Sequence, residues 1–574
     1  MKKIISLLLA LTMILSLAAC AAYDGKDSKE TSGSKDTTVT KESDTRTAAE
    51  STEESKEPVT ITLYPANANL TSGKVGGWLG EYLLEQGIIL DIWAYSDEKT
   101  NAIFASGDLP DIMYLAKGSD FEAMSASGLL LDLEGYLDQL PSFYNSSSLM
   151  TAANYVKEYV TKGALTMLPL GVGDAGPTSD TGRFALKLMW DVYEAIGAPK
   201  FSTLEEAIPV FKKMQEYYPQ TENGTKAYAM HLFNSMDTTY FYGINSICKV
   251  LGYNYDNIAY LLLDDTVNGK YEYILDDDSI YKYGLWFYNR LYREGLLDPD
   301  SITQDRDAAK AKVETEEAGL AGWCAIPGWE KSGYYPVYFD DCKIPYYTEQ
   351  AYGGTDYIAV SAKSEKLETV FKMLELMANP DTCMIMRNGP QGELWDVDAN
   401  GKLVMTEKGI NYFIKGESVT IGDNENYTLF NTQYFINSGV ETSYGEPYPE
   451  EYWSEALDLK SQSETMDTWR KTTGYNSFME LVEEKDAIIK EPFNANVTKF
   501  AEKPSDEMQL LITTAKDLIV TASWKMVYAR NDTEFEKLWA DLVKDCEDLD
   551  VKQIVDWRLE QLENATKIRD SLSK

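Results

Sequence analysis

The chain has 574 residues, of which 44% are hydrophobic and 12% aromatic, ample apolar material for folded domains. It carries 92 acidic against 53 basic residues, and the resulting formal net charge of −39 argues against nucleic acid as a partner. A single histidine, His231, excludes a histidine-rich metal site and leaves little room for histidine-based catalysis. We expect His231 to be packed rather than functional.

The chain begins with the pattern of a secretory signal peptide, residues 1–19. Two lysines precede an apolar run that ends in small residues. The sequence Leu17-Ala18-Ala19-Cys20 at its end resembles a bacterial lipobox. The resemblance implies cleavage before Cys20 and a diacylglyceryl group on its sulfur, and two acyl chains anchor durably in a membrane. An ordinary signal peptide with a coincidental cysteine is the alternative.

Residues 20–58 are predicted to form a lipidated cysteine followed by a disordered tether. This segment is almost entirely Ser, Thr, Lys, Asp, Glu, Gly and Ala, with Tyr23 its only aromatic residue. A coil of this length spans on the order of 35 Å. No second apolar run is long enough to cross a bilayer. We therefore expect an extracytoplasmic protein, lipid-anchored to the cell membrane of a Gram-positive host.

Beyond the tether, strand and helix patterns alternate, which predicts an α/β layer of mostly parallel strands. Strand patterns cover Val59–Tyr64 and Ile88–Tyr95, and a third strand follows the turn Gly107–Ile112. Helix patterns cover Gly76–Gln86 and Glu98–Ser106 between them.

Later segments continue this alternation. Thr203–Tyr218 is predicted as a helix with Thr203 as its N-cap and Glu206 in the capping-box position. Tyr357–Val360 is a strand pattern, Leu367–Met377 is a helix pattern, and residues 508–568 form a final set of helices.

One stretch matches the spacing of a calcium-binding EF-hand loop. It runs from Asp396 to Glu407, but no helix pattern precedes it, and Asn400-Gly401 is a type I′ hairpin signal. We expect a hairpin here, and another around Asn268-Gly269. No metal and no cofactor are expected.

The remaining cysteines are widely spaced and lack a Cys-x-x-Cys pair, which excludes a zinc–cysteine site. Buried free thiols are favoured, with a single Cys324–Cys342 bridge as the alternative. The five are Cys248, Cys324, Cys342, Cys383 and Cys546.

Six short motifs follow one another along the chain after the tether. They are Gly107–Ile112, Ala198-Pro199 with Thr203–Glu206, Arg293–Pro299, Ala318–Trp329, Gly389–Trp395 and Glu534–Trp557. The residues of these motifs and their order resemble those of the extracellular solute-binding lipoproteins of bacterial ABC importers, in the large carbohydrate-associated group (family 1-like). Some relatives carry a calcium loop after the helix that corresponds to Thr203–Tyr218. Here the stretch Tyr218–Ala227 lacks the leading and trailing acids, which argues against bound calcium.

The resemblance implies the periplasmic-binding-protein-like II fold, in which two discontinuous α/β lobes are joined by a hinge and a ligand cleft lies between them. Lobe 1 would comprise residues 59–170 plus about 320–410, and lobe 2 residues 171–319 plus about 411–574. A cluster of Gly and Pro places the first hinge crossing near Leu168–Gly176. The return is expected near Gly319–Gly328, and a third crossing between about 400 and 450.

Carbohydrates offer flat C–H patches to aromatic faces and hydroxyl groups to amides, carboxylates and arginine. Trp329 and Trp323, in the expected return crossing, are the leading candidates for ligand contact. For every candidate, plain packing is the alternative, and for Arg183 it is a salt bridge within a lobe. The complete set is Trp329, Trp323, Trp78, Asn67, Tyr240, Tyr242, Asp356, Tyr357, Gln391, Trp395 and Arg183.

The function implied is that of a monomeric, lipid-anchored substrate-binding component of an ABC transporter. It would capture a carbohydrate, expected to be an oligosaccharide, and deliver it to the permease subunits without breaking a bond. Two alternatives stay open: a surface glycoside hydrolase, which needs only two suitably spaced carboxylates, and a ligand-sensing or adhesion lipoprotein with no transport role.

Overall fold

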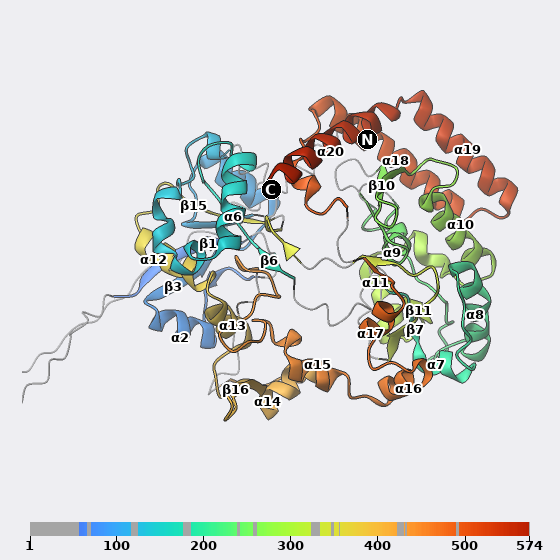
Figure 1. The fold of residues 1–574 in the computed structure, drawn as a ribbon, viewed down its shortest axis with the longest axis horizontal. Helices are drawn as coiled ribbons and strands as arrows, with labels where there is room; N and C mark the ends of the chain where they lie inside the picture. Colours follow the sequence, from blue (N-terminus) through green and yellow to red (C-terminus); the bar gives the residue numbers. More distant parts are fainter. Residues whose placement is uncertain are drawn as a thin grey trace, which may run out of the picture. The chain divides into compact units, whose positions relative to one another are not determined.

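A computed structural model describes most of the chain after the predicted tether (Figure 1). The described residues are 57–65, 70–115, 124–175, 185–237, 241–255, 261–322, 333–345, 349–354, 356–421, 430, 433–489 and 493–572. They belong to one compact unit, Lys56–Lys574. None of the helices in these ranges is both long and apolar enough to cross a bilayer.

The largest sheet has six strands in the order β2-β3-β1-β4-β15-β5. Its centre is parallel, with β1 pairing to β3 on one side and to β4 on the other. The strands are β1 (Val59–Tyr64), β2 (Gly73–Lys74), β3 (Ile88–Ile92), β4 (Ile112–Leu115), β5 (Leu168–Pro169) and β15 (Tyr357–Val360). The helices α2 (Gly77–Glu85) and α3 (Asp97–Ser106) connect the parallel strands, which confirms the predicted strand–helix alternation.

The outer strands differ from the expected parallel layer. β15 pairs antiparallel to β4 and to β5, and β2 pairs antiparallel to β3. β15 follows β4 by more than 200 residues in the sequence, so no short βαβ connection fixes its direction.

Asp111, in the predicted turn before β4, ties three parts of this sheet together. Its carboxylate accepts the backbone N–H of Thr62 at 2.9 Å and the hydroxyl of Ser364 at 2.7 Å, and Lys366 Nζ lies at 3.1 Å. Burial alone would raise the pKa of Asp111, but these hydrogen bonds outweigh it and lower the pKa. The acid of this motif is therefore a structural crosslink between β1, β4 and the chain after β15.

A second group of elements surrounds β7 (Lys187–Met189), which lies between β11 (Ala321–Gly322) and β12 (Tyr334–Pro336) in an antiparallel sheet. The predicted helix is α8 (Leu204–Tyr217), and Thr203 caps it by accepting the N–H of Glu206 at 3.2 Å. The Glu206 carboxylate in turn accepts the N–H of Ser202 at 2.8 Å, whereas a capping box would have it accept the N–H of Thr203. A further antiparallel sheet comprises β8 (Tyr253–Tyr255), β9 (Leu262–Asp265) and β10 (Lys270–Tyr273).

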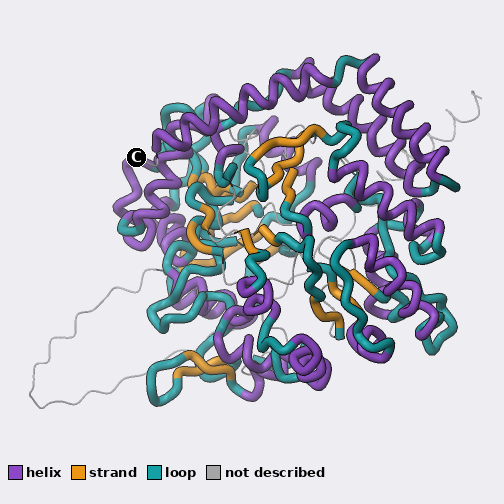
Figure 2. Tube along the Cα trace, turned by 45° about the vertical axis from the view of Figure 1, so that its right-hand side comes forward, coloured by secondary structure: helices purple, strands orange, loops and turns teal. Residues whose placement is uncertain are grey.

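Three long helices complete the chain, as predicted. They are α18 (Asp506–Val527), α19 (Asp532–Asp548) and α20 (Lys552–Leu572). α18 packs against α19 and against α10 (Ile280–Arg293). Figure 1 shows α18 beside α19, and the tube in Figure 2 shows long helices packed side by side.

Two expectations about turns need correction. Both hairpins form, β16 (Trp395–Val397) with β17 (Leu403–Met405) and β9 with β10, but neither has a type I′ turn. A type I′ turn needs positive φ at both central residues, and here only Gly401 and Gly269 have it. In the first hairpin Asp398 Oδ1 accepts the N–H groups of Asn400 and Lys402, which stabilises a wider loop.

Part of the expected return crossing near Gly319–Gly328 lies outside the described residues, which end here at Gly322. At Ala321–Gly322 the chain is still paired with β7, because these small residues complete that buried antiparallel sheet. The chain joins the six-stranded sheet again only at β15.

The remaining helices and strands of the described residues are not part of the sheets and helices given above. They are α5 (Pro141–Tyr144), α6 (Ser147–Tyr155), β6 (Gly173–Asp174), α7 (Trp190–Ala195), α9 (Ile244–Val250), α11 (Arg306–Lys310), β13 (Ile344–Pro345), β14 (Glu349–Gln350), α12 (Leu367–Leu376), α13 (Pro380–Asn388), α14 (Glu407–Gly409), α15 (Ser454–Lys460), α16 (Glu464–Thr473), α17 (Phe478–Glu484) and β18 (Ile488–Ile489). Cys248, Cys342, Cys383 and Cys546 are free and buried, as favoured from the sequence, and Cys324 lies outside the described residues.

Candidate functional site

Three chain segments meet where the chain leaves and rejoins the six-stranded sheet. β6 pairs antiparallel with β14. Val172, next to β6, donates its N–H to the carbonyl of Phe435 at 2.8 Å and accepts the N–H of Asn437 at 2.8 Å. The first segment lies within the predicted crossing Leu168–Gly176. A crossing built from several paired segments is the architecture of a hinge between two parts of one chain.

The backbone at this crossing is tightly packed around Gly353. Its φ of +76° lies in the left-handed region, and a Cβ atom there would lie 2.8 Å from the Leu170 carbonyl oxygen and 2.9 Å from the Cβ of Pro169. Gly354 donates its N–H to that same Leu170 carbonyl at 2.8 Å. Both the dihedral angle and the close approach therefore require glycine at position 353.

A half-buried lysine holds this turn from a distant part of the sequence. Lys499, in the short 3₁₀-helix η8 (Val497–Phe500), donates from Nζ to the carbonyls of Gly353 at 2.6 Å and Gly354 at 2.5 Å. Burial lowers the pKa of Lys499 to about 8, although the charge of Asp356 opposes this. Lys499 thus connects the segment before α18 to the crossing.

Aromatic rings pack beside Lys499. Tyr155 contacts Tyr352 at a centroid distance of 4.9 Å, Phe500 at 5.4 Å and Tyr159 at 5.9 Å. The hydroxyl of Tyr155 donates to the Lys499 carbonyl at 2.7 Å. Tyr352 and Tyr159 are only half-buried, so this group is part packing and part surface.

A second aromatic group lies at the carboxyl ends of the central parallel strands, where open α/β sheets bind ligands. Trp93 follows the end of β3 and donates its N–H to the carbonyl of Leu63 in β1 at 2.8 Å. Tyr95 packs on Tyr64 with ring centroids 5.9 Å apart, and Lys99 Nζ lies 5.3 Å from the Trp93 ring centroid. Trp93, Tyr95 and Lys99 are half-buried and offer an aromatic face beside a cation. We call Trp93, Tyr95 and Lys99 the strand-end group.

One strand boundary explains why the strand-end group is absent from the predicted contacts. The sequence pattern predicts a strand that continues to Tyr95 and includes Trp93, whereas β3 ends at Ile92. The alternating burial of β3 also ends at Ile92, and Ser96 then caps α3 by accepting the N–H of Lys99 at 3.1 Å. The capping serine was the signal that these residues belong to a loop.

Two of the predicted ligand contacts lie at the crossing. Asp356 is half-buried, and its carbonyl accepts the N–H of Leu170 at 3.0 Å. Tyr357 begins β15 opposite Leu115 and Pro169 and is 7% exposed. Asp356 is the more accessible of the two.

Two further predicted contacts lie elsewhere. Trp78 in α2 is half-buried and stacks on Tyr82 with ring centroids 5.4 Å apart. Tyr242 donates its N–H to Asp237 Oδ1 at 2.7 Å, and Asp237 also accepts the indole N–H of Trp524 at 2.5 Å. Burial raises the pKa of Asp237 to about 6, with those two hydrogen bonds opposing the shift.

Gln391 and Trp395 form part of the β16–β17 hairpin. Trp395 is 1% exposed, and its indole N–H donates to the Gly389 carbonyl at 2.7 Å. Gln391 is exposed and donates to Asp396 Oδ1 at 2.9 Å. The Trp395 ring is packed in this structure and has no face open to a ligand. Trp329, Trp323, Asn67, Tyr240 and Arg183 lie outside the described residues, as does Cys20.

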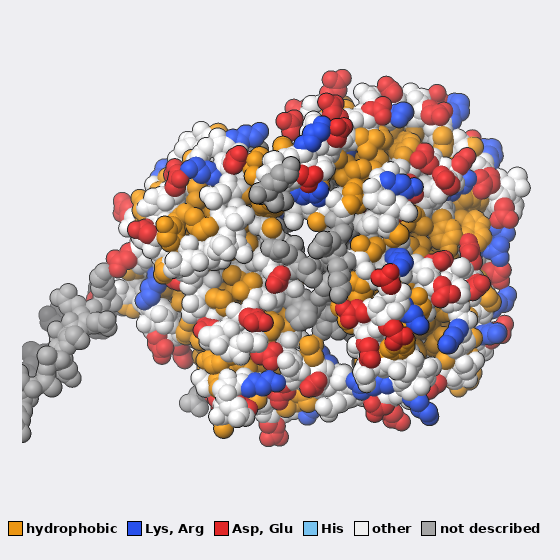
Figure 3. Space-filling view, viewed as in Figure 1, with side chains coloured by type: hydrophobic (Ala, Val, Ile, Leu, Met, Phe, Trp, Pro, Cys, Tyr) orange, Lys and Arg blue, Asp and Glu red, His pale blue; other side chains and the backbone are white. Residues whose placement is uncertain are grey.

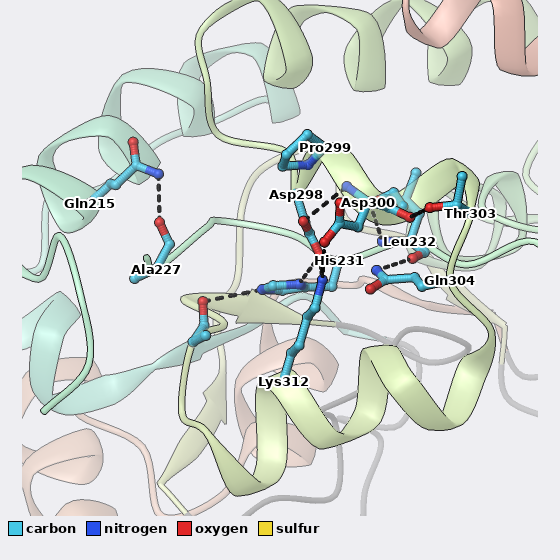
Figure 4. A network of polar contacts seen from close by, with 12 residues as sticks. Gln215, Ala227, His231, Leu232, Asp298, Pro299, Asp300, Thr303, Gln304 and Lys312 are labelled. Carbon is cyan, nitrogen blue, oxygen red and sulfur yellow. Dashed lines mark hydrogen bonds and ion pairs between the residues drawn. The ribbon is translucent and has the colours of Figure 1, made fainter. Parts of the chain in front are cut away.

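His231 is packed, as expected, in a buried polar network with Asp298 (Figure 4). Across the described part of the chain, no three His, Cys, Asp or Glu side chains are placed to share a metal ion. Acidic side chains are spread over the face seen in Figure 3, with basic ones between them, rather than gathered in one patch. Half-buried aromatic side chains thus lie both beside the crossing and at the strand ends.

Comparisons with known proteins support the fold. No family model matches the sequence, and no curated protein matches it. Among solved structures, an HMO-binding solute-binding protein associated with an ABC transporter, from Bifidobacterium longum infantis, is 14% identical with a TM-score of 0.59, over 89% of this chain and 99% of that one. The Streptococcus pneumoniae ABC-transporter substrate-binding protein FusA, solved with kestose, is 15% identical with a TM-score of 0.56, over 89% and 100%. The alginate-binding protein AlgQ2 is 13% identical with a TM-score of 0.55, over 90% and 100%.

These likenesses extend over nearly the whole of each solved chain, so they concern the complete architecture rather than one shared motif. The chain has the mixed α/β fold of the solute-binding proteins of ABC transporters, of the periplasmic-binding-protein type, as the resemblance implied.

Proposed function

We propose that the protein is the substrate-binding component of an ABC importer and that it captures a carbohydrate, specifically an oligosaccharide. The observation that carries the proposal is the shared fold along almost the entire chain, with similar proteins whose names specify HMO, kestose and alginate. Aromatic side chains at the strand ends and beside the crossing supply the faces that sugar rings stack on.

The ligand contacts we propose combine predicted and newly found residues. Trp329, Trp323, Asn67, Tyr240 and Arg183 keep their predicted roles. Trp78, Tyr242, Asp356, Tyr357 and Gln391 are joined by the strand-end group, of which Trp93 is the most favourable because its ring is half-buried beside a cation.

The mechanism we propose is binding with conformational change and no chemistry. Parts of the chain on either side of the crossing close on the ligand, because ligand shifts the population toward the conformation it contacts more extensively. The permease subunits then distinguish the closed from the open form.

Attachment completes the proposal. Cys20 carries the lipid, and the tether holds a monomeric protein outside the cell membrane, on a Gram-positive cell. Anchoring raises the local concentration of the binding protein beside the permease.

A thermal-shift screen of the full-length protein against a panel of oligosaccharides tests this function. A true ligand at 100 times its Kd stabilises the folded state by about 2.7 kcal/mol, and thus raises the melting temperature. Trp93→Ala should weaken binding of that ligand by about tenfold, while Tyr144→Ala, on an exposed ring of α5, should leave it unchanged. Stabilisation by no saccharide, or the appearance of cleaved products, would contradict the proposal.

A further inference from the structure

The only histidine of the chain is buried at the meeting point of three segments. His231 is 1% exposed and lies beside Asp298, which is 2% exposed. Bridge pairings join the segment before His231 to Gly319 and to Leu297. Figure 4 shows the imidazole ring beside the Asp298 side chain, and the carbonyl of Ala318 lies 3.2 Å from the other ring nitrogen.

Both nitrogens of the His231 ring face groups that can only accept a hydrogen bond. Nδ1 lies 2.9 Å from the Asp298 carboxylate oxygen Oδ2, and Nε2 lies 3.2 Å from the Ala318 carbonyl oxygen. A neutral imidazole carries one proton and would direct a bare lone pair at one of these oxygens. The geometry is therefore satisfied only by imidazolium, in which both nitrogens donate.

The charges around the ring form an alternating chain. Asp298 Oδ2 is shared by His231 and by Lys312 Nζ, which lies 2.8 Å away, and Lys312 also contacts Asp300 at 2.9 Å. Burial alone would raise the pKa of Asp298, but hydrogen bonds from His231 and Lys312 outweigh it and hold that pKa well below the usual range. Tyr228, which packs edge-on against the His231 ring with the ring centroids 5.9 Å apart, is a further titratable neighbour.

The Ala318 carbonyl is also the start of a structural connection. It accepts the N–H of Tyr228 at 2.8 Å, and Leu320 and Ala321 donate their N–H groups to the carbonyls of Tyr228 and Ala229 at 2.9 Å. These bonds hold β11, the strand immediately before Trp323 in the sequence. The His231 ring thus contacts a carbonyl that lies shortly before β11 in the sequence.

We propose that the His231 network is a pH-sensitive switch on β11. In the imidazolium form, His231 ties the Ala318 carbonyl to the Asp298 carboxylate. As pH rises, the ring releases its Nε2 proton to water and keeps its Nδ1–H bond to Asp298. The Nε2 lone pair then faces the Ala318 oxygen, and the repulsion loosens the segment that leads into β11.

Nuclear magnetic resonance of the single histidine tests the protonation state directly. The full chain is produced with ring-labelled histidine and without a polyhistidine tag, so that one imidazole gives the whole signal. At pH 7.5 a free imidazole, with an ordinary pKa of about 6.5, is mostly neutral. We expect instead the paired nitrogen signals of imidazolium. A ring with one bare nitrogen at this pH would overturn the proposal.

Variants at the ends of the network separate a switch from plain packing. Lys312 competes with His231 for the same oxygen of Asp298, so Lys312→Met should move the histidine transition to higher pH, and Asp298→Asn should move it to lower pH. Asp300→Asn, which removes only an exposed contact of Lys312, is the matched control and should have a much smaller effect. A Lys312→Met transition that stays in place or moves to lower pH would contradict the proposal.

Hydrogen exchange measures the effect on β11. After correction for intrinsic base catalysis, the amides of Leu320 and Ala321 should exchange about tenfold faster above the histidine transition than below it. Equal protection on both sides of the transition would overturn the link to β11 even if the ring titrates as expected. Neither result depends on sugar binding, so failure here is distinguishable from failure of the proposed transport function.

Discussion

Asp111 illustrates how a motif residue can be structural rather than functional. It lies in the Gly107–Ile112 turn that contributed to the family resemblance, and it binds Thr62, Ser364 and Lys366 rather than facing a ligand. Three segments of this chain converge on its carboxylate.

Replacing Asp111 should therefore cost stability. Asp111→Ala leaves buried donors without a partner, and we expect unfolding to become easier by about 3 kcal/mol at pH 7. Ser364→Ala, which removes one donor only, should cost about 1 kcal/mol. Because the folded-state pKa of Asp111 is lowered, its contribution is present above the unfolded value of about 3.9 and is lost as pH falls below it. Urea unfolding of wild type and Asp111→Ala at pH 7 and pH 3.5 measures this contribution. An equal difference in the free energy of unfolding between the two proteins at both pH values would contradict it.

Lys499 predicts a pH dependence of the same sign as that of Asp111, but in an alkaline range. Its pKa is lowered to about 8 in the folded protein against about 10.4 in an unfolded chain. Between these values the unfolded state binds the additional proton, so folding becomes more favourable as pH rises. We expect wild type to gain on the order of 2 kcal/mol relative to Lys499→Met between pH 8 and pH 10. Denaturant unfolding of both proteins across that pH range measures this change. If the free energies of unfolding of wild type and Lys499→Met change equally with pH, the prediction is refuted.

Among the secondary-structure elements, the local patterns were readable and the long-range pairings were not. β1, α2, α3, α8 and the C-terminal helices follow from periodicity and caps, because those signals lie within a few residues. The antiparallel insertion of β15 between β4 and β5 depends on residues far apart in the chain, and no local signal specifies it.

The candidate site was predictable only in part. Residue type led to Trp78, Tyr242 and Asp356, but packing decides which ring is accessible, and it buries Trp395 completely. Trp93 and Tyr95 were not predicted as ligand contacts because the predicted strand extended past the true end of β3 at Ile92. The end of a strand is its least predictable property.

The turn at the crossing can be tested with two matched glycines. Gly353 and Gly87 have nearly identical φ angles, +76° and +75°, but only Gly353 lacks room for a Cβ atom. Alanine should cost about 1 kcal/mol at position 87 through backbone strain. At position 353 the contact with Leu170 should add about 1–3 kcal/mol. Equal losses in thermal unfolding would show that the crossing relaxes freely around Gly353.

At the scale of the whole molecule, similarity of fold over nearly complete chains carries more weight than any one site residue. Sequence identities of 13–15% preserve the architecture while leaving the ligand-contacting side chains free to differ.

Calorimetric titration of the wild-type protein with the oligosaccharide that stabilises it most, followed by recovery of that saccharide, tests the central claim most directly. We predict saturable binding of one ligand per chain and recovery of the saccharide chemically unchanged. Absence of saturable binding, or recovery of shortened or rearranged product, would contradict a binding protein that performs no chemistry.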